Sequence, residues 1–132
     1  MKLNSLMIIT AALLAIYGIG FVVAPAPLLS LLGIATDPAV AFVTRAFGAA
    51  LIGYAVMNWF ARNAVDSDAR RAIVLADASF NALAIVVNLL GTLSGVLNVL
   101  GWSNVVIHLL LAAGFAYFLV RPSFATPTSA TR

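Results

Sequence analysis

Three ionisable side chains other than tyrosines lie within long apolar segments of the sequence: Arg45, Asp77 and His108. A charge near the centre of a bilayer costs at least about 2.5–3.5 kcal/mol, so such residues normally face the interior of a helix bundle. Arg45 could bind an anionic headgroup or substrate from the outer side, or it could extend toward the membrane surface. Asp77 could be a proton-coupling carboxylate, but we favour a side chain that reaches back toward Arg70 or Arg71.

His108 cannot form a metal or haem site with the rest of this sequence. Zinc needs three or four ligands, and the chain contains one histidine and no cysteine. We therefore expect a structural histidine that bonds Asn88 or Tyr17. The sequence also has no paired carboxylates and no nucleophile beside a base. It predicts no catalytic residue, no cofactor and no metal, and it favours a non-enzymatic protein.

The third apolar segment carries a polar stripe, formed by Asp77, Asn81, Ala84, Asn88 and Gly91. Their successive spacings of 4, 3, 4 and 3 residues place them on one face of a helix. We favour a packing role, in which amides and small residues pair across helices at about 0.6 kcal/mol for each bond. The alternative is that the stripe lines a polar cavity.

Polar residues from four segments fall at a similar depth if the segments alternate in direction. At about 1.5 Å per residue, each of the following lies roughly 8–11 Å below the outer surface: Tyr17, Arg45, Asn88 and His108. Asp77 and Asn81 lie deeper, so a direct salt bridge between Arg45 and Asp77 needs helix tilt or a bridging water. Thr10 shares a helix face with Tyr17, and Asn104 shares one with His108.

The composition explains why these residues are sought inside a membrane. Of the 132 residues, 64% are hydrophobic and 8% are charged, whereas soluble domains average about 45–50% apolar and about 25% charged residues. Such a chain cannot cover a water-facing surface, and it is too hydrophobic to be disordered. The net charge of +3 comes from a few scattered basic residues, so nucleic acid is not an expected partner.

The apolar segments predict an all-α bundle of four transmembrane helices. We expect the spans at about 3–23, 38–61, 71–93 and 103–120, and a disordered cytoplasmic tail at 121–132. The first span is too long for the apolar region of a cleaved signal peptide. Pro25 and Pro27 end it, and a short helix capped by Gly33 should follow at the membrane interface.

The distribution of Lys and Arg predicts the orientation. With four spans, six basic residues lie on one side and none on the other: Lys2, Arg62, Arg70, Arg71, Arg121 and Arg132. The positive-inside rule then places both termini in the cytoplasm of a bacterium, with the bundle in its inner membrane.

Short motifs along the chain add a family resemblance. They are Tyr17-Gly18-Ile19-Gly20, Pro25-Ala26-Pro27-Leu28-Leu29, Gly33, Asp37-Pro38, Arg45-Ala46-Phe47-Gly48, Trp59-Phe60-Ala61-Arg62 and Gly101-Trp102. In these motifs the chain resembles small four-helix bacterial membrane proteins of unknown function. The resemblance implies a four-helix inner-membrane protein and supplies no activity.

Two functional hypotheses are favoured over an enzymatic role. We favour an accessory or assembly subunit that packs against other membrane proteins or against itself, because small interhelical residues and very short loops suit that role. The alternative is a small transporter or channel with a path lined by the polar stripe and Arg45. Because four short helices should enclose little volume, that alternative requires a parallel homo-oligomer.

Overall fold

The computed structural model describes residues 2–120, and within that range the chain is helical with no strands. The helices are α1 (Leu3–Val23), α2 (Pro25–Leu31), α3 (Pro38–Ala61), α4 (Asp68–Leu93) and α5 (Gly101–Leu119). All except α2 are long and apolar enough to cross a membrane. The prediction of an all-α chain with four such helices is confirmed. The tail predicted at 121–132 lies outside the described residues.

The helix boundaries follow local capping. Asp37 accepts a hydrogen bond from the Val40 backbone N–H at 2.8 Å, and Pro38 occupies the first turn of α3. The Ser67 hydroxyl accepts from the Arg70 backbone N–H, so α4 begins at Asp68 and not at the predicted residue 71. The short helix α2 forms as expected, with Pro25 in its first turn. Its position at a membrane surface stays a prediction.

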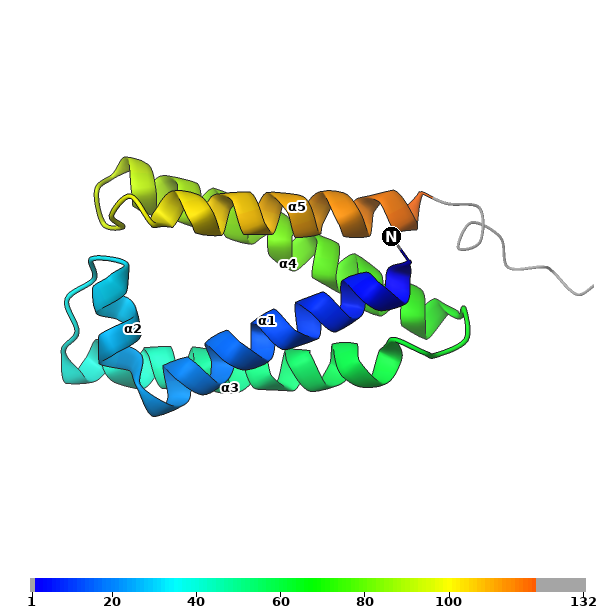
Figure 1. Ribbon diagram of the computed structural model, residues 1–132, viewed down its shortest axis with the longest axis horizontal. Helices are drawn as coiled ribbons and strands as arrows, with labels where there is room; N and C mark the ends of the chain where they lie inside the picture. The colour runs from blue at the N-terminus through cyan, green and yellow to red at the C-terminus, as the bar shows by residue number, and fades with distance from the viewer. Residues whose placement is uncertain (1, 121–132) are drawn as a thin grey trace, which may run out of the picture.

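The four long helices form two antiparallel hairpins (Figure 1). One hairpin is α1 and α3 with α2 at its turn, and the other is α4 and α5. The hairpins meet at the end that holds the N-terminus and the α3–α4 linker, and they diverge toward the opposite end. The predicted basic cluster of Lys2, Arg62, Arg70 and Arg71 therefore lies at the closed end; which side of a membrane this is stays a prediction.

Two apolar clusters reflect this divergence. The shared core lies at the closed end and draws on α1, α3, α4 and α5 through Leu3, Leu6, Met7, Ala61, Val74, Phe115 and Phe118. The buried residues of the hairpin core come from α1, α2 and α3, namely Leu14, Phe21, Leu29, Leu51 and Ala55, and the partly buried Phe80 of α4 packs against them. The second hairpin thus contributes no fully buried apolar residue at the divergent end.

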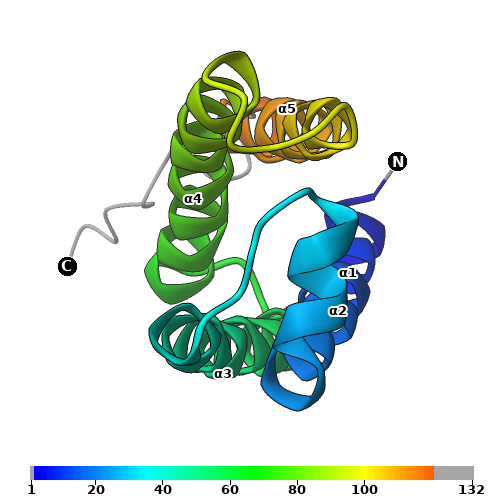
Figure 2. The same ribbon diagram turned by 90° about the vertical axis from the view of Figure 1, so that its left-hand side faces the viewer.

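A backbone contact at the divergent end bridges the hairpins again. Asn98, in the loop between α4 and α5, donates its backbone N–H to the Leu32 carbonyl at 2.8 Å. Its side-chain Nδ2 donates to the Leu31 carbonyl, also at 2.8 Å. Viewed from this end, the α2–α3 segment crosses the space between the hairpins (Figure 2). These bonds connect the end of α2 to the opposite loop.

Candidate functional site

A cavity of about 570 Å³ lies between the hairpins, above the shared core. Most of its wall is aliphatic or aromatic, and every helix contributes to it. Its polar members are Thr10, Tyr17, Thr44, Asn81, Asn88, Asn104 and His108, and no charged side chain within residues 2–120 lines it. The cavity arises because the hairpins diverge, and it is partly open, so the expectation that one chain encloses little volume stays a prediction. Ligand pockets typically measure about 300–1,000 Å³.

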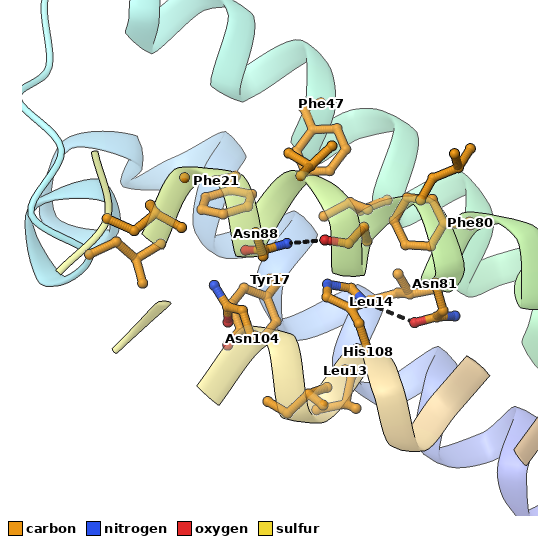
Figure 3. A pocket seen from close by; sticks show the side chains of 18 of the residues that line it. Leu13, Leu14, Tyr17, Phe21, Phe47, Phe80, Asn81, Asn88, Asn104 and His108 are labelled. Atoms are coloured by element: carbon orange, nitrogen blue, oxygen red, sulfur yellow. Dashed lines mark hydrogen bonds between the residues drawn. The ribbon is translucent and has the colours of Figure 1, made fainter. Parts of the chain in front are cut away.

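His108 is held by Asn81 across the α4–α5 interface (Figure 3). The distance between His108 Nδ1 and Asn81 Oδ1 is 2.8 Å. The Asn81 amide nitrogen donates to the Asp77 carbonyl at 2.8 Å, which fixes the amide orientation and leaves its oxygen facing the imidazole. Nδ1 must therefore carry the hydrogen. In the neutral ring, Nε2 is then a hydrogen-bond acceptor on the far side from Asn81.

The predicted partners of His108, Asn88 and Tyr17, are therefore wrong, although both lie around the same cavity. Residue counting places the polar groups at a common depth only for upright helices, whereas α4 crosses behind α5 at an angle (Figure 1). That tilt brings Asn81, which was placed too deep, level with His108. The imidazole also packs against Phe80, with ring centroids 6.0 Å apart in an edge-on arrangement. The ring is thereby positioned from two sides.

Three other polar groups face the cavity with spare hydrogen-bonding capacity. Asn88 donates its Nδ2 to the Ala84 carbonyl of its own helix at 2.8 Å, which leaves its side-chain oxygen available. No hydrogen bond joins the side chains of Asn104 or Tyr17 to another residue in the range 2–120. Figure 3 shows Tyr17, Asn88, Asn104 and His108 gathered around one region of the cavity. The part of the α4 polar stripe from Asn81 to Gly91 thus lines the cavity.

Asp77 occupies a different environment from the one predicted. Its side chain is fully buried, and Oδ1 accepts a hydrogen bond from Asn58 Nδ2 of α3 at 3.0 Å. Arg70 is committed elsewhere: it bonds Asp66 at 2.7 Å, and Asn4 and the Arg62 carbonyl at 2.9 Å each. The expectation of a link from Asp77 to the arginines at the start of α4 was wrong. At this end of the stripe, Asp77 therefore joins α4 to α3.

Asn58 was missed by sequence reasoning, although it is completely buried. Ionisable residues and the stripe of the third span stand out in the sequence, because several polar residues share a face there. Asn58 stands alone among apolar neighbours on its own helix and shows no spacing pattern. The signal that could have found it is the cost of any unpaired amide in a membrane span, which requires a partner on a neighbouring helix.

Arg45 does not join the other predicted residues. It is exposed and absent from the cavity wall, and its Nε donates to the Val22 carbonyl at the end of α1 at 3.3 Å. Its side chain therefore extends toward the divergent end, which is the second of the two roles considered for it. No ion pair joins Arg45 to Asp77 among the described residues, where the salt bridge is between Arg70 and Asp66.

The described residues contain no group of three or more His, Cys, Asp or Glu side chains that could hold a metal ion. No protein-family model, no curated protein and no solved structure matches the chain. The conclusion that this is a helical protein with four membrane-length spans therefore rests on its own sequence and structure.

Proposed function

We propose that this protein is a small non-enzymatic membrane protein that binds a neutral, amphipathic small molecule in the cavity between its hairpins. The observation that carries the proposal is the cavity wall, which is mainly apolar, lacks charged side chains and places several polar groups together. An ionic ligand would have no countercharge there, and leaving a charge unpaired in an apolar site is costly.

The polar groups define the hydrogen-bonding character of the ligand. His108 Nε2 and the Asn88 side-chain oxygen are acceptors, whereas Asn104 and Tyr17 can both donate and accept. A ligand with a hydroxyl group next to an apolar chain can donate to one of the two fixed acceptors, accept a hydrogen bond from Tyr17 or Asn104, and fill the apolar wall. Terpenoid and long-chain alcohols have this chemistry.

The test uses the fact that the chain has a single histidine. Protein labelled with ¹⁵N-histidine in detergent micelles gives ring-nitrogen NMR signals from His108 alone. Titration with farnesol should shift the signal of the unprotonated Nε2, because a hydroxyl donates to it. Farnesyl methyl ether, which lacks the donor, should leave it nearly unchanged. Equal responses to both compounds, or no response to farnesol, would contradict the proposal.

A variant comparison separates binding from unfolding. His108→Phe keeps an aromatic ring but removes the acceptor, and we expect it to weaken retention of farnesol measured by native mass spectrometry. Ser79→Ala, at an exposed position of α4, should bind like the unmodified protein. Equal farnesol retention in both variants would show that His108 does not contribute to farnesol binding.

The accessory or assembly role remains a second candidate on a separate observation. A face of α3 formed by Ala46, Ala49, Ala50 and Gly53 points out of the bundle, and a Cβ added at Gly53 would meet nothing within 4 Å. Small residues of this kind allow close helix approach in membranes. Native mass spectrometry after mild purification tests it: a stoichiometric foreign subunit supports it, and a bare monomer contradicts it.

A further inference from the structure

A polar layer separates the two apolar clusters. It consists of Thr10, Asn58, Asp77 and Asn81, which are 2%, 0%, 0% and 1% exposed. On α1, Thr10 lies between Met7 of the shared core and Leu14 of the hairpin core. On α3, Asn58 lies between Ala61 and Ala55 of the same two clusters. Thr10 and Asn81 also line the cavity, so the layer borders the cavity on the side of the shared core.

Hydrogen bonding in this layer is incomplete in a specific way. Asn58 Nδ2 donates to Asp77 Oδ1, yet the second oxygen of the carboxyl group and the oxygen of the amide have no partner among the described residues. The Thr10 hydroxyl is also unpaired. The two side chains thus meet with one hydrogen bond made and with one acceptor left over on each. What is missing between them is a donor.

An ionised Asp77 would be isolated at this position. Its own helix offers Arg70, which already bonds Asp66, Asn4 and the Arg62 carbonyl. On the neighbouring helices, Tyr54 of α3 interacts electrostatically with Asp77, and His108 of α5 is bonded to Asn81. The other titratable groups of these helices, Arg45 and Tyr117, are exposed. The buried face of α1 carries no titratable side chain. A buried carboxylate without a countercharge is strongly disfavoured.

We propose that Asp77 is a proton-binding site, with the proton on Oδ2 donated to Asn58 Oδ1. The acid and the amide then form a ring of two hydrogen bonds that joins α3 to α4. Proton uptake from water supplies the missing donor, and release returns the proton to water, with no other bond made or broken. The ionised form leaves two acceptors facing each other across the hairpin interface and weakens the joint beneath the cavity.

Infrared spectroscopy tests this directly on the whole protein in lipid vesicles. The chain contains four acidic side chains, and Asp37, Asp66 and Asp68 are exposed. At neutral pH the spectrum should show the carbonyl stretch of one protonated carboxylic acid. That band should disappear in Asp77→Asn, remain in Asp68→Asn, and shift without disappearing in Asn58→Leu, which removes the amide partner.

The infrared spectrum of the unmodified protein is enough to overturn the proposal. The test therefore does not depend on whether the variants fold. Absence of a protonated-acid band at neutral pH means that Asp77 is ionised, and the site does not hold a proton. A protonated-acid band that persists in folded Asp77→Asn belongs to another residue and also contradicts the proposal. A carboxylate band that shifts between sodium and potassium buffers would assign the layer to a cation and would overturn the proton site. None of these outcomes depends on a ligand in the cavity.

Discussion

The close approach of α1 and α3 at two glycines allows a quantitative prediction. A Cβ added at Gly48 would lie 2.8 Å from the Gly18 carbonyl oxygen and 2.9 Å from Phe21 Cβ. Carbon–oxygen contacts settle at about 3.3–3.6 Å, so Gly48→Ala must move the helices apart by roughly 0.5 Å. Because the obstructing oxygen belongs to backbone, no side-chain rotation relieves the contact.

Gly53→Ala is the matched control on the same helix, where an added Cβ meets nothing within 4 Å. Both substitutions gain the helix preference of Ala over Gly, about 0.8–1.0 kcal/mol. Only Gly48→Ala overpacks an interface, which costs about 1–3 kcal/mol. The difference in unfolding free energy between the two variants isolates that packing cost, because the helix-propensity gain cancels.

The assay is unfolding of the purified protein in mixed micelles with increasing SDS, followed by Trp59 and Trp102 fluorescence. Gly48→Ala should unfold at lower SDS than Gly53→Ala, which should match or exceed the unmodified protein. The reciprocal variant Gly18→Ala should behave like Gly48→Ala. The double variant should cost less than the sum of the two, because one helix separation relieves both contacts. Coincident curves for the position 48 and position 53 variants would refute the close-packed arrangement.

Two further predictions concern the ends of the bundle. Arg70→Ala should lower the unfolding free energy by about 2–3 kcal/mol, because charge-assisted bonds to Asn4, Asp66 and the α3–α4 linker are lost. The control Arg71→Ala, at an exposed position, should be nearly neutral. Equal SDS midpoints for the two variants would contradict the prediction. Asn98→Ala removes one of two bonds to the end of α2, so hydrogen–deuterium exchange should rise in the residue 31–36 segment while the helix ends at residues 61–68 stay unchanged.

The number and approximate positions of the long helices could be predicted from the sequence because helix ends are set locally, although α4 begins at Asp68 and not at the predicted residue 71. Pro25, Asp37-Pro38 and Ser67 determine where helices begin through the backbone geometry and capping bonds of a few adjacent residues. Apolar length then separates membrane-length helices from the short one. None of these signals depends on how the helices pack together.

The polar contacts were harder to predict because they depend on tilt and on partners remote in sequence. His108 and Asn81 were placed at different depths by counting residues from helix ends, and the slant of α4 removed that difference. Asp77 is hydrogen-bonded to Asn58, a residue that no periodic pattern in the sequence identifies. The cavity likewise arises from the angle between hairpins, a property that no single segment encodes.

The hairpin arrangement also has a consequence for biosynthesis. The hairpin core, with its Gly18–Gly48 contact, is built from α1, α2 and α3, all of which precede residue 62 in the chain. Domains and local units generally form as the chain emerges from the ribosome, and contacts that are near in sequence form fastest. The first hairpin can therefore pack while α4 and α5 are still being translated. The Asn58 amide would then be bonded only within α3, to the Tyr54 carbonyl, until the second hairpin supplies Asp77 as its partner.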